Sequence, residues 1–349
     1  MAIEKLLEQL FVSICVPAYN AEHTVGEALG SILAQTYQNI EVVVVDDGSS
    51  DRTAEVVHSF KDSRVSYFHN PQNLGGFQTM NKAILLSKGE LVAVYHADDI
   101  YEPTIVEKEV AYLQSKPDVG AVFSLDHFID QEGHVYGGAT MPSEFRGKEF
   151  LKYEEVFPFL MRYKNILFCC PTFMVRQNVL NVVGLFNAEK YDIAADLELW
   201  LRISRQFSVG ILDERLMYYR HTKAQWSSRY KRLRTTPEMF FAIMDDYIAM
   251  DRWSQRLSPK EFIEYAFHRC DDETFRAVNW VIQGEPHKAK QLLNHPYPWQ
   301  TLFTDPQQRK LRRKLRVLLM RILLAIGISL GLSQPLTQLL VWTEYGGHV

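Results

Sequence analysis

Apolar runs and amphipathic segments alternate regularly through the first 125 residues of the chain. Short apolar runs, which we expect to be strands, cover residues 11–20, 40–47, 64–70 and 90–99. Between them, apolar residues recur at three- and four-residue spacing, which predicts helices over residues 21–37, 51–60, 75–89 and 102–117. A chain in which strands and helices alternate folds as a mostly parallel sheet with helices on both faces.

The polar residues that follow these apolar runs should meet at one edge of the sheet. Residues 42–45 are four consecutive valines, as expected for a strand that is buried on both faces. In an open parallel sheet, ligands bind beyond the carboxyl ends of the strands. The polar residues at these ends are Tyr19, Asn20, Asp46, Asp47, Asp98 and Asp99. We therefore expect them to line one rim.

The pattern after residue 118 is less regular. We expect a strand and a hairpin over 119–138, a helix over 191–207 and a strand over 209–221. Residues from about 235 to 304 have the pattern of helices rich in aromatic side chains. The predicted fold class is α/β, with a helical C-terminal extension. The predicted domains are 1–230, with halves 1–118 and 119–230, and a helical region 231–349 that contains a basic amphipathic segment, 305–332.

Composition fits a globular protein and argues against a general affinity for nucleic acid. The 349 residues are 47% hydrophobic and 23% charged, and the net charge is −4. The four cysteines show no CxxC spacing, which favours reduced thiols and a cytoplasmic protein. Residues 1–11 contain acids and no cleavable apolar core, so we expect a short amphipathic helix rather than a signal peptide.

The segment 305–332 differs from the rest of the chain in charge. From Asp305 onward there are seven Lys/Arg and two acids, which gives about +5 there and about −9 elsewhere. The residues of one helical stripe in this segment are Leu311, Leu315, Leu318, Leu319, Ile322 and Ile326. A basic amphipathic helix is typical of peripheral contact with an anionic membrane. The apolar run Ile322–Leu332 has 11 residues, too few to span a bilayer. A core-packing helix and a dimer contact are the alternatives.

Each acidic pair alone could belong to an ordinary turn or cap, because Asp, Gly and Ser favour such positions. Together they form an acidic rim, and no Lys or Arg follows either pair immediately. Hard divalent cations bind carboxylates and complete their shell with water and substrate phosphates. The chain has no GxGxxG after its first strand and no GxxxxGK[ST], so the usual backbone phosphate cradles are missing. The rim therefore favours a diphosphate bridged by a metal ion.

The segments "SICVPAYNAEHTVGEALGSILAQTYQNIEVVVVDDGSSDRTAEVV" and "NLGGFQTMNKAILLSKGELVAVYHADD" resemble the nucleotide-binding half of family 2 inverting glycosyltransferases of the GT-A fold. Several motifs agree in order and spacing over about 110 residues, and more loosely to about residue 225. The resemblance implies that Pro17, Tyr19 and Asn20 lie against the base and ribose. It also implies that Asp47, with Asp46 beside it, binds the base. Asn73, Gly75 and Asn81 would close over the nucleotide.

The resemblance also implies a metal site and a catalytic base. Asp98 and Asp99 match the motif that holds Mg²⁺ or Mn²⁺ at the diphosphate, with Asp98 also near the ribose, but His96 replaces the first acid of the family's D-A-D-D. "AADLELWLR" resembles the family's E-D-x-x-L-W-L-R, which assigns Asp196 as the base that takes the acceptor proton. Ala195 stands where the family has Glu. The alternative is that Asp196 only caps its helix, which Asp often does, and capping is compatible with catalysis.

Two residues near the end of the matched region have open roles. His221 follows the last predicted strand, where similar enzymes place a His or Arg near the diphosphate, although a lone His is more often structural. Trp226 could stack on a sugar or pack in the core.

The resemblance implies a hexosyltransferase that adds one sugar from a UDP-, GDP- or dTDP-linked donor. The processive Q-x-x-R-W motif is absent. We expect a lipid-linked or surface glycan as acceptor and a cytoplasmic enzyme peripheral to the inner face of the membrane. One alternative, a nucleotidyltransferase, would show a basic glycine-rich loop after the first strand, and "VPAYNAEHTVG" has no Lys or Arg. The other, a catalytically inactive nucleotide-sugar-binding protein, is supported by His96 and Ala195.

Overall fold

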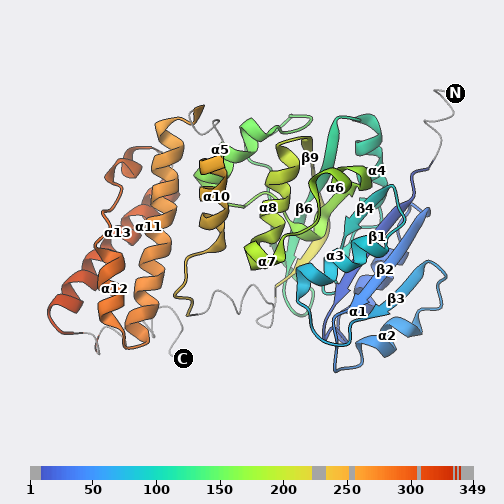
Figure 1. The fold of residues 1–349 in the computed structure, drawn as a ribbon, viewed down its shortest axis with the longest axis horizontal. Coiled ribbons are helices and arrows are strands. Elements are labelled where there is room, and N and C mark those ends of the chain that lie inside the picture. The colour runs from blue at the N-terminus through green and yellow to red at the C-terminus, as the bar shows by residue number, and fades with distance from the viewer. Residues whose placement is uncertain are drawn as a thin grey trace. The chain divides into compact units, whose positions relative to one another are not determined.

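The computed structural model describes residues 9–221, 233–250, 256–304 and 308–332, with positions 335 and 338 (Figure 1). The chain divides into two compact units. The first consists of Met1–Phe157 and Asn165–Lys223, and the second of Pro158–Lys164 and Ala224–Val349. The predicted helix over residues 1–11 and the side chain of Trp226 lie outside the described residues.

The first unit is built on a mixed nine-stranded sheet in the order β3-β2-β1-β4-β8-β6-β9-β5, with β7 paired to β6. Strands β1 to β4 are mutually parallel, as predicted. Beyond β4 the sheet is mixed, because β8 runs antiparallel to both β4 and β6, while β6 and β9 are parallel. The strands are β1 Val12–Ala18, β2 Ile40–Asp46, β3 Val65–His69, β4 Leu91–Val94, β5 Ile100–Tyr101, β6 Val119–Ile129, β7 Val135–Gly138, β8 Phe173–Arg176 and β9 Ser208–Arg220.

Helices cover both faces of the parallel part of the sheet. Side chains alternate between the two faces of a strand. Val42 and Val44 pack in one core cluster with residues of α1 and α4, yet Val43 and Val45 are also buried, on the side where α3 packs against β1 and β2. The helices of this unit are α1 Val25–Leu33, α2 Thr53–Ser59, α3 Gly76–Leu86, α4 Ile105–Ser115, α6 Gln177–Val183, α7 Ala188–Tyr191 and α8 Ala195–Ser204. Helix α5, Tyr153–Tyr163, begins in this unit, and its residues from Pro158 belong to the second.

The strand register places the predicted rim at one edge. Ala18 at the end of β1 pairs with Asp46 at the end of β2, and Asp46 pairs with His69 at the end of β3. The loop that contains Asp98 begins directly after β4, which pairs with β1 on its other side. The loops after β1, β2 and β4 therefore leave the sheet at the same edge.

The second unit is helical, as the sequence predicts. Its helices are α10 Met239–Met250, α11 Pro259–Ile282, α12 Pro286–Leu293 and α13 Gln308–Ser329, with a 3₁₀ turn at Trp299–Phe303. Helix α11 packs against both α12 and α13. The end of α5 belongs to this unit, where the Arg162 carbonyl lies 3.0 Å from Nε2 of His268. Within the described part of the chain, no helix combines the length and the hydropathy that crossing a bilayer requires.

Candidate functional site

The loops after β1 and β2 are tied together by Asn20. Its backbone N–H donates to the Ser49 hydroxyl at 2.9 Å, and its side-chain oxygen accepts from the Ser50 N–H at 2.9 Å. Asn20 adopts a left-handed conformation, with φ of 47°, that asparagine tolerates better than most residues. Beside it the Tyr19 ring is 52% exposed, and Pro17 is half-buried in β1. Tyr19 thus offers an aromatic face at the rim, while Asn20 fixes the loop.

Asp46 is a buried organising carboxylate rather than an open ligand. It accepts hydrogen bonds from the Ser49 N–H at 2.8 Å and from the Tyr67 hydroxyl at 2.7 Å. One bond goes to each oxygen, so Asp46 holds the turn after β2 against β3. Asp47, the second of the two adjacent acids, instead contacts the loop that leads into α3.

Asp47 shapes the loop that leads into α3. One oxygen accepts from the Asn70 side chain and from the Leu74 N–H, each at 2.8 Å, and the other accepts from the Gly75 N–H at 2.9 Å. Asn73 also accepts from the Gly75 N–H, at 3.1 Å. Gly75 has φ of 91°, a conformation that glycine adopts without strain, and it directly precedes α3. The resemblance assigned these residues to the nucleotide, and the structure brings them together in one hydrogen-bonded loop.

Asn81 lies on α3 and bonds within the protein. Its amide donates to the Phe186 carbonyl at 2.8 Å and accepts from the Phe186 N–H at 3.0 Å. This pairing joins α3 to the segment before α7. The geometry gives Asn81 a positioning role.

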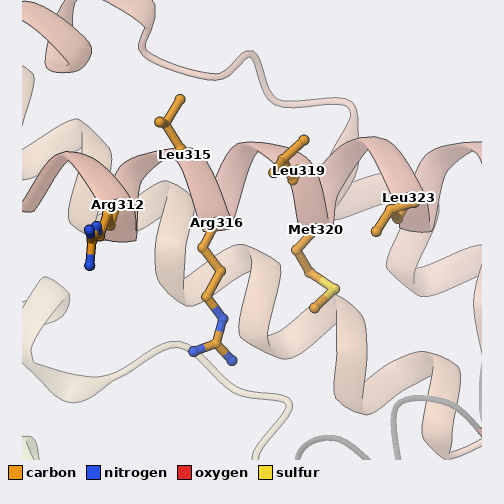
Figure 2. Close-up of a pocket in the computed structure, with 6 residues that line it drawn as sticks. All are labelled: Arg312, Leu315, Arg316, Leu319, Met320 and Leu323. Atoms are coloured by element: carbon orange, nitrogen blue, oxygen red, sulfur yellow. The ribbon is translucent and has the colours of Figure 1, made fainter.

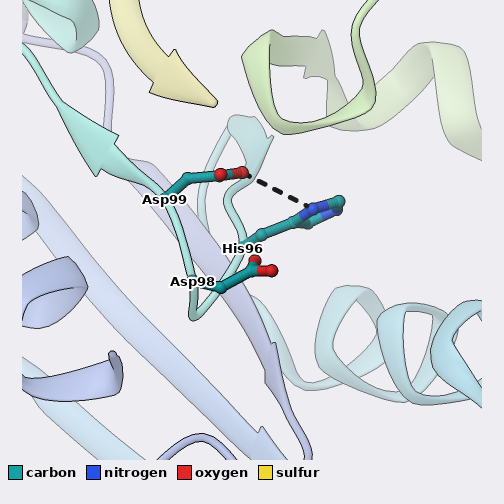
Figure 3. A group of neighbouring side chains, drawn as sticks. All are labelled: His96, Asp98 and Asp99. Atoms are coloured by element: carbon teal, nitrogen blue, oxygen red, sulfur yellow. Dashed lines mark ion pairs between the residues drawn. The ribbon is translucent and has the colours of Figure 1, made fainter. Parts of the chain in front are cut away.

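The loop between β4 and β5 brings His96, Asp98 and Asp99 together (Figure 3). Each side chain offers one ligand atom, and these atoms all lie within 4.8 Å of one another. Asp99 is 1% exposed, whereas His96 and Asp98 are partly accessible. The His96 N–H donates to the Tyr101 hydroxyl at 2.6 Å, and the Tyr101 ring stacks on Tyr95 with centroids 4.0 Å apart. The loop is therefore anchored on a packed aromatic pair.

Asp99 has the chemistry of a cation ligand. One oxygen accepts from the Arg220 N–H at 2.9 Å, and the other is buried without a hydrogen-bond partner. Burial, and then the nearby charge of Asp98, raise the pKa of Asp99 well above its ordinary range. A divalent cation would supply the missing positive charge and occupy the unpartnered oxygen. Asp98 and Asp99 thus fit the Mg²⁺ or Mn²⁺ that the sequence predicts.

Arg220 supports this loop, and the sequence analysis missed it. Its guanidinium donates to the Asp98 carbonyl at 3.0 Å and to the Gln131 carbonyl at 3.0 Å, and pairs with Glu27 at 2.6 Å. In addition, the backbone N–H of Arg220 donates a hydrogen bond to one of the two carboxylate oxygens of Asp99. The only sequence signal was the position of Arg220 beside His221 at the end of a predicted strand.

Asp196 lies in the first turn of α8, where its oxygen accepts from the Leu197 N–H at 2.7 Å. The N-cap residue is Ala194, so Asp196 is not the N-cap. Burial raises the pKa of Asp196 to about 7. A carboxylate with such a pKa suits a general base near neutral pH.

Cys170 and Asp126 are further buried titratable groups of the first unit. Burial raises the pKa of the Cys170 thiol, and the charges of Asp196 and Asp99 raise it further. Asp126 is a further buried carboxylate that the sequence analysis missed, and Cys169 donates to it at 3.5 Å. Burial raises the pKa of Asp126. A single acid in a strand carries no spacing signal that would have revealed it.

His221 lies one residue beyond Arg220 and is exposed. Its ring nitrogen Nδ1 contacts the Tyr136 hydroxyl, and the ring packs 5.2 Å from that of Phe128. Its backbone N–H donates to the Ile129 carbonyl at 2.9 Å. His221 thus follows the residue that contacts the metal loop, and its own side chain contacts aromatic residues of β6 and β7.

Sequence comparisons relate this chain to known proteins. The sequence model of the family described as Glycosyl transferase family 2 matches residues 13–184 of this chain. An uncharacterized glycosyltransferase of Haemophilus influenzae is 31% identical over 222 residues, which cover 63% of this chain and 68% of the relative. The Escherichia coli protein WfaP, a UDP-Glc:alpha-D-GlcNAc-diphosphoundecaprenol beta-1,3-glucosyltransferase, is 25% identical over 224 residues, 64% of this chain and 82% of that protein.

A solved structure shows the same fold. The mannosyltransferase PcManGT from Pyrobaculum calidifontis, in complex with GDP-Man and Mn²⁺, matches with a TM-score of 0.53 at 18% identity. The match covers 97% of this chain and 86% of that one. The predicted fold class is confirmed by this likeness.

Proposed function

The chain belongs to glycosyltransferase family 2 and has the GT-A fold, and on that basis we propose that it moves one sugar from a nucleotide donor to an acceptor, with inversion at the anomeric carbon. The proposed donor is UDP-, GDP- or dTDP-linked. The proposed acceptor is a lipid-linked or surface glycan, because WfaP acts on a diphosphoundecaprenol-linked sugar. The proposed cofactor is Mg²⁺ or Mn²⁺, since PcManGT was solved with Mn²⁺.

The observation that carries this proposal is the unpartnered oxygen of Asp99. It is buried beside Asp98, in a loop that leaves the carboxyl end of β4. Asp98 and Asp99 would hold the cation, which when bound supplies positive charge to the departing diphosphate. Arg220 holds the loop through its backbone N–H and its guanidinium.

The β1 and β2 loops would bind the nucleotide. The ring of Tyr19 is exposed at the rim and that of Pro17 is half-buried. Asn20 holds their loop through its hydrogen bond to Ser49. Asp47 orders the backbone of Leu74 and Gly75. The residues that we propose to surround the nucleotide are Pro17, Tyr19, Asn20, Asp46, Asp47, Asn73, Gly75, Asn81, Asp98 and His221.

Asp196 would be the catalytic base. The acceptor hydroxyl attacks the anomeric carbon, and its proton moves to a carboxylate oxygen of Asp196. As the new C–O bond forms, the bond between the anomeric carbon and the diphosphate oxygen breaks, and the nucleoside diphosphate leaves with the electron pair. Inversion requires one base and no covalent intermediate; the other acid in the first turn of α8, Glu198, is paired with Arg202.

Donor hydrolysis tests this function. With Mn²⁺ and a panel of UDP-, GDP- and dTDP-sugars, the protein should slowly release nucleoside diphosphate from one donor. Asp99→Asn should abolish this release, whereas Asp118→Asn, the same change at an exposed position, should not. If the folded protein binds donors but neither hydrolyses nor transfers any of them, the inactive binding protein becomes the better account.

Peripheral attachment to an anionic membrane through α13 is the second part of the proposal. Two of its basic residues are buried: Lys314 is 2% exposed and donates to Glu264 at 2.7 Å, and Arg321 donates to the His295 carbonyl at 2.6 Å. Its exposed residues include Leu315, Leu319, Ile322, Leu323 and Ile326. The simple core-packing alternative would have buried these leucines.

The charged residues beside this apolar face favour an anionic membrane as its binding partner. Arg312 and Arg316 are exposed and line a hollow together with Leu315, Leu319, Met320 and Leu323 (Figure 2). Basic residues beside exposed leucines complement anionic headgroups above acyl chains, and each inserted leucine contributes about 1.5–3 kcal/mol.

Vesicle binding tests this attachment. Leu319 is 59% exposed, so Leu319→Glu should leave the fold intact. It should weaken binding to phosphatidylglycerol vesicles about tenfold or more, because a leucine contact is lost and an anion is added. Leu85→Glu is the matched control, because Leu85 is 75% exposed on α3. No binding by the native chain, or loss of a dimer instead of vesicle binding, would contradict the proposal.

A further inference from the structure

His96 contributes an imidazole to the group formed with Asp98 and Asp99. Its Nδ1 lies 3.7 Å from the Asp99 oxygen that has no partner. Its Nε2 is buried and also lacks a hydrogen-bond partner. Figure 3 shows the imidazole and the two carboxylates directed to the same side of the loop.

We propose that His96 is a nitrogen ligand of the divalent cation held by Asp98 and Asp99, and that it biases the site toward Mn²⁺ and Co²⁺ over Mg²⁺. Carboxylates and water suit Mg²⁺, whereas imidazole favours transition metals. The inference rests on the proposed function for the presence of a cation, and it deepens that function by assigning a third ligand.

A purely structural role explains the position of His96 less well. The 3.7 Å separation from Asp99 is longer than a hydrogen bond. Buried polar atoms are nearly always paired in folded proteins, yet both Nε2 of His96 and one oxygen of Asp99 are not. Because one ring nitrogen of His96 and one oxygen of each carboxylate lie within 4.8 Å of one another, one cation could contact all three side chains.

The anchoring of the loop supports a fixed ligand. The backbone of His96 is held by the Tyr101 hydroxyl, and Arg220 holds the carbonyl of Asp98. Ligands held by such surrounding contacts impose their geometry on a metal, and loss of a supporting contact alone typically costs 10–100-fold in metal affinity. Removal of a direct ligand should cost at least as much.

The test compares metal binding by the full chain and its variants. Mn²⁺ is titrated by electron paramagnetic resonance, alone and with UDP or GDP, and Mg²⁺ and Co²⁺ are added as competitors. His96→Ala should weaken Mn²⁺ binding at least tenfold. His96→Asp should keep a cation site but lower the preference for Mn²⁺ and Co²⁺ over Mg²⁺ at least tenfold. His134→Ala, in an exposed cluster elsewhere, should behave as the native protein.

Pulsed resonance supplies a direct signature. Bound Mn²⁺ should show coupling to one imidazole ¹⁴N that disappears in both His96 variants and persists in His134→Ala. Circular dichroism verifies that each variant is folded, and His96→Asp keeps the test decisive if His96→Ala fails to fold. An unchanged metal preference without ¹⁴N coupling, or no Mn²⁺ binding at all, would overturn the proposal.

The two proposals fail separately. Mn²⁺ bound with ¹⁴N coupling, in a protein that neither hydrolyses nor transfers any donor, would support the His96 ligand and refute the transferase. Metal-dependent hydrolysis with the same metal preference in His96→Asp would refute the His96 ligand alone.

Discussion

Replacing Asp196 by asparagine removes the proposed base with little change of shape. The asparagine oxygen can still accept the Leu197 N–H that now lies 2.7 Å from the carboxylate, so the start of α8 should be preserved. Only the capacity to take a proton is lost. We therefore expect donor binding to remain and transfer to fall.

The structure sets the size and pH dependence of the effect. General base catalysis contributes about 10²–10⁴-fold, or roughly 3–5 kcal/mol of transition-state stabilisation. Burial raises the pKa of Asp196 to about 7, so the base is deprotonated only above that pH. In the native enzyme kcat/KM should fall to about one-tenth of its plateau at pH 6 and about one-hundredth at pH 5.

The pH dependence of the native protein's stability should run opposite to that of its activity. A carboxyl group whose pKa is higher in the folded than in the unfolded state binds more protons when folded, so the native protein loses stability as pH rises from about 4 to about 7. Asp196→Asn removes this loss. At pH 8 the variant should therefore have the higher Tm, while at pH 4 the two should be similar.

The assay measures transfer across pH 5–9, donor binding by calorimetry and Tm for three proteins. They are the native chain, Asp196→Asn and Asp192→Asn, the same change at an exposed position nearby. Only Asp196→Asn should lose transfer. Unchanged transfer in Asp196→Asn would refute the assignment of Asp196 as the base. So would a control, Asp192→Asn, in which kcat/KM no longer falls below pH 7.

Three further substitutions test the supporting structure. Gly48→Ala should lower stability by about 1–2 kcal/mol in chemical denaturation, because Gly48 has φ of 76°; an unchanged midpoint would contradict this. Arg220→Met removes the guanidinium contacts with the metal loop and with Glu27, so Tm and Mn²⁺ affinity should both fall, and unaltered Mn²⁺ binding would show that the loop holds its shape alone. Lys314→Met leaves Glu264 buried without its cation, at a cost of about 3–5 kcal/mol that Glu264→Gln should partly recover; equal stability of the single and double variants would argue against the ion pair.

Local pattern was enough to predict the parallel half of the fold. The four consecutive valines predict a strand that is buried on both faces of the sheet, and residues 42–45 of β2 are buried in that way. The same pattern put Asp46, Asp98 and their neighbours at the ends of parallel strands, where the register now places them. The antiparallel pairing of β8 with β4 lacked such a signal, because a strand with three apolar residues and an arginine does not specify a direction.

Long-range contacts account for what the sequence could not predict. Arg220 and Asp99 are 121 residues apart, and their bond depends on β9 returning beside β5. Helix α13 showed a basic and an apolar stripe, but the burial of Lys314 depends on Glu264, 50 residues away along the chain. Asp47 looked like an open acid and proved to be the acceptor of several loop amides. Such roles are set by tertiary partners rather than by spacing.

The most direct test of the central claim is the position of a bound cation. A crystal of the full chain grown with Mn²⁺ and UDP or GDP, measured near the manganese absorption edge, locates the ion by anomalous scattering. We predict one peak among His96, Asp98 and Asp99, in contact with the nucleotide diphosphate. No peak there, or a peak only at the exposed cluster of Asp130 and His134, would contradict the account.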